Sequence, residues 1–421
     1  MQNERRVLIS ALLKAEKDGY SNLILDSVLK DAELTDIQKG FVTTAFYGVI
    51  ERKITIDFVL NQYLKRPIKK APPMTSTVLR SGAYQILFMD KIPNSAAVDE
   101  SVKIIKKSKE NGNSGLVNAV LRKLASEDNV SVLNDADPSV KYSVENWIFE
   151  RLKNKYGLKA AEDFLKASLL PPPVFIRINN LKQNAKEQTL NELEQLGASC
   201  KETDLENTFE ITSVKGIENL KSYKEGCFFV QDFSSQLCAK AVDAKKGERV
   251  LDCCAAPGGK TFSVSLNMED EGEVVALDLH PHRAKLIKKG AERLGLKSVN
   301  AFDADATNYL EELGNFDKVL CDVPCSGIGV IRRKPEIKYK KEDECGELLP
   351  VQKGILSTAS KYVKKGGRLV YSTCTLLKEE NEDIVNEFLN NFKEFNLISS
   401  KTFLPPCDKG DGFFIAVMER A

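Results

Sequence analysis

The sequence predicts three kinds of structure in order: an all-α N-terminal domain, a small α+β unit and a C-terminal α/β domain. Apolar residues recur at helical spacing from residue 4 to about residue 125. A proline run then precedes a short stretch of mixed strand and helix patterns, and from Cys227 onward strands and helices alternate. We place the regions at 1–130, 131–170 (a helical connector), 171–230 and 231–421.

The composition is that of an ordinary globular protein. The chain has 421 residues, of which 42% are hydrophobic and 29% charged. No run of 18 apolar residues and no signal peptide pattern occurs, so we expect a cytoplasmic protein. The ten cysteines form no C-x-x-C pair, and the histidines are His280 and His282, so we expect reduced thiols and no metal site.

Amphipathic helices account for the N-terminal region. The apolar sets are Val7, Leu8, Ala11, Leu12, Ala15; Phe41, Val42, Ala45, Phe46, Val49; Ala97, Val98, Val102, Ile105; and Leu116, Val117, Val120, Leu121, Leu124. Residues 1–130 carry 20 basic and 15 acidic side chains, a net charge of +5, with clusters at 65–70 and 103–109. This excess suits an anionic partner such as RNA, although solvated helix faces explain it equally well.

The connector and the small unit are less regular. Asp137-Pro138-Ser139 predicts a helix start, Trp147 is expected to be packed, and the prolines at 171–173 end the helical part. Strands are predicted at 174–179 and 209–212, with a helix marked by Leu190, Leu193 and Leu196 between them. A unit of about 60 residues is marginal by itself, so it should pack on its neighbour.

The C-terminal region predicts a largely parallel sheet that is covered on both faces. Its strand-like runs are 250–252, 274–278, 299–303, 319–322 and 369–372, and a last strand is predicted at 413–418. Ligands of such sheets bind outside the carboxyl ends of the strands. The loops that follow these strands are therefore the candidate functional sites.

A glycine turn follows the first of these strands. Residues 252–260 read D-C-C-A-A-P-G-G-K, and the pattern after them predicts a helix start. Gly258 and Gly259 allow a ligand to approach the main chain, although an ordinary strand-to-helix loop is the plain alternative because lone glycine motifs are weak signals. Asp278 ends the second strand and suits ribose hydroxyls, and Asp303 ends the third and suits an adenine amino group.

Both NAD(P) and S-adenosylmethionine fit these two acids. The turn does not have G-x-G-x-x-G spacing, and Asp252 would repel a phosphate but suits an ammonium or a sulfonium. These features favour S-adenosylmethionine.

Two cysteines follow neighbouring strands of the predicted sheet. Cys325 lies in Asp322–Gly327 and Cys374 in Ser372–Thr375. A single loop cysteine is usually a small packed residue, but two beside an acid and a cofactor turn suggest chemistry at a pyrimidine. A thiolate that adds to carbon 6 makes carbon 5 nucleophilic, and a base must then remove the carbon 5 proton. Asp322 can meet the cytosine amino group, and Lys260 is the nearest cation by sequence to help a thiol ionise.

Three long motifs carry a family resemblance. D-C-C-A-A-P-G-G-K-T, D-V-P-C-S-G-I-G-V-I-R-R-K-P-E-I-K and Y-S-T-C-T-L-L-K-E-E-N-E resemble motifs of the RNA cytosine-5 methyltransferases of the NOL1/NOP2/Sun family. The N-terminal region, with I-P-N-S-A-A-V-D-E-S-V-K and G-L-V-N-A-V-L-R-K-L, is similar to the NusB RNA-binding domain. The resemblance implies a NusB-like domain, an RRM/ferredoxin-like unit and a Rossmann-like class I methyltransferase domain, as in bacterial enzymes that modify 16S ribosomal RNA.

The resemblance also implies roles for individual residues. Cys374 would be the nucleophile, and Cys325 would assist release of the enzyme from the methylated base. The implied S-adenosylmethionine contacts are Cys254, Ala255, Ala256, Pro257, Gly258, Gly259, Lys260, Asp278, Asp303 and Asp322, with Arg283 near the ribose. Asp305 is an alternative to Asp303, and Cys253 would be a packed spectator. DNA cytosine-5 methyltransferases attack with a Pro-Cys thiol, so Cys325 is the rival nucleophile.

The resemblance thus implies an enzyme, which we expect to be monomeric, that methylates carbon 5 of a cytosine in 16S ribosomal RNA. The helical domain and the small unit would hold RNA, and the basic stretch 331–334 would contact its backbone. One alternative is a non-catalytic NusB-like RNA-binding or antitermination factor. This alternative is disfavoured because the chain retains both cysteines, Asp322 and Lys260. A small-molecule methyltransferase is disfavoured by roughly 170 residues of RNA-type accessory structure before the catalytic part.

Overall fold

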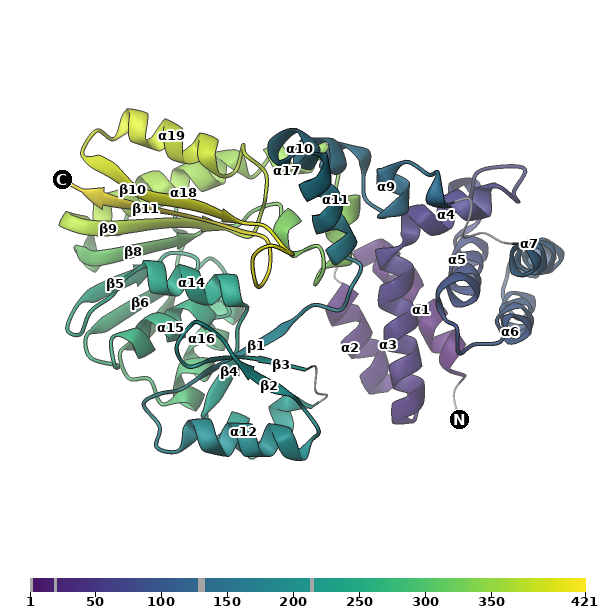
Figure 1. Ribbon diagram of the computed structural model, residues 1–421, viewed down its shortest axis with the longest axis horizontal. Coiled ribbons are helices and arrows are strands. Elements are labelled where there is room, and N and C mark those ends of the chain that lie inside the picture. The colour runs from purple at the N-terminus through teal and green to yellow at the C-terminus, as the bar shows by residue number, and fades with distance from the viewer. Residues whose placement is uncertain (1–2, 19–20, 128–132, 213–215) are drawn as a thin grey trace. The chain divides into compact units, whose positions relative to one another are not determined.

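The computed structural model describes residues 3–18, 21–127, 133–212 and 216–421. It divides into two compact units (Figure 1). The first contains Met1–Leu169 with Arg333–Lys340, and the second contains Leu170–Arg332 with Lys341–Ala421. The chain therefore leaves the second unit shortly after Cys325, contributes eight residues to the first, and returns.

The described part of the first unit is helical, as predicted. Its helices are α1 (Glu4–Asp18), α2 (Ser21–Asp31), α3 (Asp36–Glu51), α4 (Lys53–Asn61), α5 (Pro73–Phe88), α6 (Asn94–Lys106), α7 (Ser114–Ser126), α9 (Pro138–Lys141), α10 (Asn146–Tyr156) and α11 (Leu158–Ala167), with 3-10 turns η1 (Ile68–Lys70), η2 (Asn111–Asn113) and η6 (Pro335–Tyr339). The four apolar patterns fall in α1, α3, α6 and α7. Asp137 caps α9 by accepting the Ser139 N–H at 2.8 Å, which confirms the predicted helix start.

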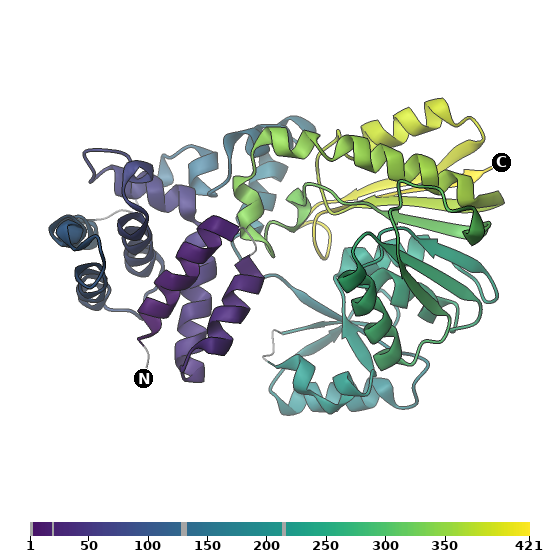
Figure 2. The ribbon, with the colours of Figure 1, turned by 180° about the vertical axis from the view of Figure 1, so that it is seen from behind.

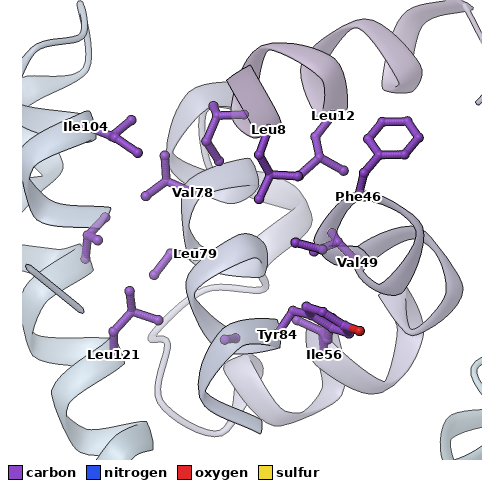
Figure 3. Packing of buried hydrophobic residues seen from close by; sticks show 14 of the residues in the cluster. Leu8, Leu12, Phe46, Val49, Ile56, Val78, Leu79, Tyr84, Ile104 and Leu121 are labelled. Atoms are coloured by element: carbon purple, nitrogen blue, oxygen red, sulfur yellow. The ribbon is translucent and has the colours of Figure 1, made fainter. Parts of the chain in front are cut away.

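One apolar core holds α1 to α7 together (Figure 3). Leu8 and Leu12 of α1 meet Phe46 and Val49 of α3, and Leu79 of α5 lies toward Leu121 of α7, all with 4% or less of their surface exposed. Burying a large aliphatic side chain stabilises a fold by about 1.5–3 kcal/mol, so this core explains why the region is ordered.

The inserted segment Arg333–Lys340 is an integral part of the first unit. The Tyr339 hydroxyl donates to the carbonyl of Ile50 and accepts the N–H of Lys53, at 2.5 and 3.0 Å. Lys338 is completely buried, and this burial lowers its pKa to about 8. The indole N–H of Trp147 donates to the carbonyl of Lys340 at 2.9 Å, so the predicted packing of this tryptophan is partly against the segment.

In the second unit, a four-stranded antiparallel sheet has the order β2-β3-β1-β4. Its elements are β1 (Val174–Ile178), α12 (Ala185–Gln195), β2 (Cys200–Glu202), β3 (Thr208–Ile211), η3 (Ile217–Asn219), α13 (Lys221–Lys224) and β4 (Phe228–Val230). The patterns predicted β1, α12 and β3 but not β2 and β4. These two strands have three residues each, too few for an apolar alternation to appear.

The larger sheet has seven strands in the order β10-β11-β9-β8-β5-β6-β7. The strands are β5 (Arg249–Asp252), β6 (Glu273–Asp278), β7 (Val299–Asp303), β8 (Phe316–Asp322), β9 (Val363–Thr373), β10 (Phe395–Phe403) and β11 (Phe413–Arg420). Strands β5 to β9 are parallel, and β11 is antiparallel both to β9 and to the edge strand β10. Six of the seven were predicted. The pattern missed β10 because only its two end residues are buried.

Helices cover both faces of this sheet (Figures 1 and 2). They are α14 (Phe233–Ala241), α15 (Gly259–Asn267), α16 (Pro281–Leu294), α18 (Leu349–Tyr362) and α19 (Glu382–Asn391). The connecting segments contain α17 (Glu342–Gly346), η4 (Glu311–Leu313) and η5 (Ile328–Val330). Alternate strand residues face opposite layers: Leu251 packs with α18 and α19, whereas Val250 packs with α14 and α15. In the part of the chain that is described, no helix is both long and apolar enough to cross a membrane.

The strand order reverses between β5 and β8. In an open α/β sheet, ligands bind at such a reversal, beyond the carboxyl ends of the strands. The loops after β5, β6, β8 and β9 meet there.

Candidate active site

The glycine turn connects β5 to α15 and is tied to the next strand. Gly258 adopts φ +109°, and a Cβ at this position would lie 2.3 Å from the Phe262 ring, so only glycine fits. The N–H of Ala255 donates to the carbonyl of Leu277 at 2.8 Å. The turn is therefore held against the end of β6, where Asp278 lies.

Asp252 is buried below this turn. Its side chain is 1% exposed, and Oδ2 accepts the Thr261 hydroxyl of α15 at 2.7 Å. Burial raises the pKa of Asp252 to about 7. The sequence interpretation had Asp252 facing a bound cation. The structure shows that it links β5 to α15 through the Thr261 hydroxyl.

Asp278 sits at the end of β6 with both carboxylate oxygens engaged. Oδ2 accepts the N–H of Ala256 and Oδ1 that of His280, each at 3.2 Å. The Arg283 guanidinium lies 3.5 Å from Oδ2 and also donates to the carbonyl of Ala256 at 3.1 Å. The turn, the acid and Arg283 thus form one connected group, and each carboxylate oxygen keeps a lone pair for a further donor.

Asp303 and Asp305 differ in what their carboxylates do. Asp303 ends β7, directly paired with Asp278 in the parallel register, and its side chain is exposed. Asp305 uses its carboxylate locally: it accepts the N–H and the hydroxyl of Thr307 at 2.9 and 2.7 Å, and these bonds lower its pKa. The geometry therefore favours Asp303 over Asp305 as the ligand-facing acid.

Asp322, at the end of β8, forms the centre of a charged cluster. Its Oδ2 lies 2.7 Å from the ammonium of Lys260, and its Oδ1 accepts the Ser372 hydroxyl at 2.8 Å. Lys260 also donates to the Ser235 hydroxyl at 3.3 Å. Burial alone would lower the pKa of Lys260. The charges of Asp322, Cys238 and Cys374 and the hydrogen bond with Asp322 together outweigh burial and raise the pKa.

The two cysteines of the loops after β8 and β9 lie in direct contact. The Sγ atoms of Cys325 and Cys374 are 3.2 Å apart, and both side chains are half-buried. The hydrogen bond with Cys374, burial and the charge of Cys374 together raise the pKa of Cys325 well above its ordinary value. These three causes favour the protonated thiol form of Cys325.

Comparison with known proteins places this arrangement in a family. A family model described as 16S rRNA methyltransferase RsmB/F matches residues 239–419, the NusB family model matches 2–126, and a ferredoxin-like domain model of RsmF/B-like methyltransferases matches 145–212. The chain is 38% identical to the probable ribosomal RNA small subunit methyltransferase B of Bacillus subtilis (strain 168), over 93% of this chain and 89% of that protein.

The chain belongs to the RsmB family of 16S rRNA methyltransferases. Ribosomal RNA small subunit methyltransferase B of Proteus mirabilis (strain HI4320) is 30% identical, with 99% of both chains covered. The crystal structure of PH0851 superposes with a TM-score of 0.83 at 27% identity and covers 100% of this chain and 99% of that one. The family and the three-part fold expected from the sequence are thereby confirmed.

In this RsmB-family chain, backbone contacts lock the two cysteine loops together. The N–H of Gly329 donates to the carbonyl of Cys374 at 3.0 Å, and the N–H of Gly412 donates to the carbonyl of Gly329 at 2.9 Å. A Cβ on Gly329 would lie 2.0 Å from the Gly412 carbonyl oxygen and 2.8 Å from that of Cys374. The absence of a side chain at residue 329 is thus a condition for the close approach of the loops.

Some of the residues named from the sequence are buried or already hydrogen-bonded, so they are not available to bind a ligand or RNA. Cys253 is buried with its Sγ 3.9 Å from that of Cys321, in keeping with a packed spectator. Burial raises the pKa of Cys254 well above its ordinary value, so it too stays a thiol. In the stretch 331–334, Ile331 is buried and Arg332 donates to the carbonyls of Leu170 and Pro171, so these two residues do not present free contacts for RNA.

The sequence reasoning missed several polar residues of the site. Ser235 and Ser372 hold the Lys260–Asp322 pair, and Gln231 accepts the Ser263 hydroxyl at 2.6 Å beside the glycine turn. Single serines and glutamines have no distinctive spacing. The one available signal was their position next to strand ends or at the start of α14.

Proposed function

We propose that this protein transfers a methyl group from S-adenosylmethionine to carbon 5 of a cytosine in 16S ribosomal RNA through a covalent adduct with Cys374. The contact that carries this proposal is the 3.2 Å approach of Cys325 and Cys374 at neighbouring strand ends, beside the Lys260–Asp322 pair. Two thiols with different tendencies to ionise match a reaction that first needs a nucleophile and then a base.

The residues at the glycine turn fit S-adenosylmethionine. When bound, it supplies a methyl group on a sulfonium. Gln231 is buried beside Gly259, and its Nε2 has no hydrogen-bond partner among the described residues, so a donor is available for an amino-acid carboxylate. Asp278 and Asp303 are paired at the ends of β6 and β7, where they can accept from ribose hydroxyls and an adenine amino group. The proposed contacts are Cys254, Ala255, Ala256, Pro257, Gly258, Gly259, Lys260, Asp278, Arg283, Asp303 and Asp322.

Cys374 is the proposed nucleophile because its partner thiol favours its ionisation. Cys325 stays protonated and can donate its S–H to a Cys374 thiolate. Lys260 lies close enough for the charge of Cys374 to raise the pKa of the lysine, and by the same interaction the ammonium stabilises the thiolate. The thiolate forms a bond to carbon 6, and the electron pair of the 5,6 double bond takes up the methyl group at carbon 5. The bond between the methyl group and sulfur breaks, and its electron pair stays on the sulfur, which leaves as a neutral thioether.

Asp322 is the proposed partner of the cytosine ring. Its carboxylate is held from two sides by Lys260 and Ser372, so its position is fixed before RNA binds. The side chain is one-quarter exposed, which leaves an edge that can accept a hydrogen bond from the amino group of the base.

Cys325 is the proposed base for the last step. Its pKa is raised first by the hydrogen bond with Cys374 and also by the charge of that residue. Both causes disappear once Cys374 is bonded to carbon 6, so the pKa of Cys325 falls at the stage when a base is needed. Cys325 then loses its S–H proton to solvent, and the resulting thiolate removes the carbon 5 proton. This re-forms the double bond, and the Cys374 thiolate leaves.

The remaining regions are proposed to hold RNA. The basic side chains at 65–70 and 103–109 are mostly exposed and lie at the ends of helices in the first unit, where phosphates can reach them. The target cytosine must be splayed out of its stack to reach Cys374. Regions 1–130 and 171–230 are accordingly proposed as RNA-binding domains, and 231–421 as the methyltransferase domain.

Methyl transfer and adduct formation together test the proposal. The full-length protein is incubated with undermethylated 16S RNA and tritiated S-adenosylmethionine, and denaturing gels detect covalent protein–RNA complexes. We expect Cys374→Ala to abolish both signals and Cys325→Ala to accumulate the complex. Cys407→Ala, at an exposed cysteine, is the matched control. Bisulfite sequencing identifies the modified base.

Two results would contradict parts of this proposal. An adduct in Cys374→Ala but not in Cys325→Ala reverses the two roles. No methyl incorporation into naked or partly assembled 16S RNA supports the non-catalytic RNA-binding alternative.

A further inference from the structure

Glu380 is a buried carboxylate that the proposed reaction does not use. It lies six residues after Cys374 and is 1% exposed. One oxygen, Oε2, accepts two hydrogen bonds, while Oε1 is buried without a hydrogen-bond partner among the described residues. An incompletely satisfied buried carboxylate lowers stability, so packing alone does not account for it.

The two hydrogen bonds of Glu380 connect it to the residues on either side of Cys325. Oε2 accepts the backbone N–H of Ser326 at 2.8 Å and the side-chain amide of Gln352, from α18, also at 2.8 Å. The same amide nitrogen donates to the carbonyl of Pro324 at 2.9 Å. Both partners of this nitrogen are acceptors, which fixes the orientation of the Gln352 amide. Oε2 of Glu380 therefore holds the peptide group after Cys325 directly and the peptide group before it through Gln352.

The backbone around Glu380 holds the strand that leads to Cys374. The Tyr371 hydroxyl, on β9, donates to the carbonyl of Glu380 at 2.7 Å. The next residue, Asn381, donates to the carbonyl of Thr375 at 3.0 Å. Glu380 and its neighbour thus connect the loop of Cys325 to the residues on both sides of Cys374.

A direct bond completes this connection. The hydroxyls of Ser326 and Thr375, the residues that follow the two cysteines, are 2.7 Å apart. The distance between the two thiols is consequently set by a closed ring of buried hydrogen bonds and not by the flexible ends of the loops.

The charge of Glu380 has a second effect. After the hydrogen bond with Cys374, burial and the charge of Cys374, the carboxylate of Glu380 is the next cause that raises the pKa of Cys325. It therefore helps to keep Cys325 a thiol in the free enzyme.

We propose that Glu380 is a positioning residue that sets the Cys325 thiol against Cys374 and thereby controls release of the enzyme from methylated RNA. This inference rests on the proposed function, because release presupposes the covalent adduct. Glu380 contacts neither substrate nor reacting atoms; it acts through Ser326 and Gln352.

The test separates the position of the carboxylate from its charge. Glu380→Ala removes the acceptor, whereas Glu380→Gln retains one oxygen for Ser326 and Gln352 but carries no charge. Glu387→Gln, at an exposed glutamate of α19 paired with Lys353, is the matched control. Single-turnover methyl transfer and the decay of the covalent complex are measured separately on 16S RNA, across pH.

For Glu380→Ala we expect the complex to decay about a hundredfold more slowly, since displacement of a reacting group by about 1 Å has effects of that size. Methyl transfer in the first turnover should fall much less. Glu380→Gln should restore most of the decay rate of the covalent complex. The rise of this rate with pH should begin at a lower pH than in the wild type, because the charge that raises the pKa of Cys325 is gone. The control should match the wild type in both steps.

The inference is overturned if Glu380→Ala folds and its covalent complex decays as fast as that of the wild type. It is also overturned if methyl transfer and decay of the complex are slowed equally in both Glu380 variants. If Glu380→Ala does not fold, Gln352→Met replaces it, with slower decay again the expected result and unchanged decay the contrary one. Failure of the proposed function is distinguishable: the wild-type protein itself then forms no adduct, and both proposals are withdrawn.

Discussion

The ammonium of Lys260 and Oδ2 of Asp322 lie 2.7 Å apart at the carboxyl ends of β5 and β8. The sequence suggested Lys260 as a cation for a cysteine, and the structure shows that its first partner is an acid. Because the charge of Cys374 also raises the pKa of Lys260, one ammonium interacts with both groups. Asp322 thereby shares the charge that would otherwise act on the thiolate alone.

Replacement of Lys260 by methionine should therefore impair ionisation of Cys374. We expect single-turnover methyl transfer to fall about a hundredfold at neutral pH, a loss typical of misplaced reacting groups. The acid limb of its pH profile should move to higher pH, because a thiolate without a nearby cation forms less readily. Lys246→Met, at an exposed lysine paired with Glu269, is the control. An unshifted profile in Lys260→Met would show that the ammonium serves Asp322 only.

The raised pKa of Cys325 predicts different reactivity for the two thiols. The thiolate is the form that reacts with iodoacetamide, so at about pH 7.5 Cys374 should be alkylated before Cys325. In Cys374→Ala, Cys325 should react faster than in the wild type, since the largest cause of its raised pKa is gone. Peptide mass spectrometry follows both sites, with exposed Cys407 as internal reference. Earlier labelling of Cys325 in the wild type contradicts the assignment.

Gly329 offers a test of the contact between the cysteine loops. In Gly329→Ala, the added Cβ would clash with the carbonyl oxygens of Gly412 and Cys374, so we expect the loops to separate and methyl transfer to fall about a hundredfold. Binding of S-adenosylmethionine, measured by calorimetry, should persist because the glycine turn is untouched. Gly346→Ala is the control, since a Cβ there meets nothing within 4 Å. Full activity in Gly329→Ala would show that the loops tolerate separation.

Local periodicity was sufficient to predict most of the fold. Helical spacing identified α1, α3, α6 and α7, and apolar runs identified β5 to β9 and β11. Strand β10 escaped because it lies at the sheet edge with most of its residues exposed. The grouping of Arg333–Lys340 with the N-terminal helices was also beyond reach, because it depends on distant contacts such as that between Tyr339 and Ile50.

The sequence predicted those residues of the candidate site that lie at the end of a strand or directly after one. Asp278, Asp322, Cys325 and Cys374 were named because carboxyl ends of parallel strands share one edge. Glu380 was not named, although it lies within a quoted motif. Its importance comes from hydrogen bonds to Ser326 and to Gln352, 54 and 28 residues away, and no local pattern reports these.

The buried Asp252 predicts a stability effect that depends on pH. Burial raises its pKa from 3.8 to about 7, so the folded state binds the proton more tightly than the unfolded state does. The free energy of unfolding should therefore decrease as pH rises from about 4 to about 7. Asparagine does not ionise and can still accept the Thr261 hydroxyl. Asp252→Asn should thus gain stability relative to the wild type between pH 5 and pH 8. We expect a gain of about 3 kcal/mol, because the wild type loses about 1.4 kcal/mol per pH unit up to pH 7.

Chemical denaturation of both proteins at the two pH values measures this difference. Asp204→Asn is the control: Lys409 and its hydrogen bond lower the pKa of this exposed acid, which is therefore ionised in folded and unfolded chains over the whole interval. Its effect should be the same at pH 5 and pH 8. If Asp252→Asn also showed no pH dependence, Asp252 would be ionised in the folded protein throughout. The charge of Lys260 would then have to compensate for its burial, because that ammonium is among the groups that lower the pKa of Asp252.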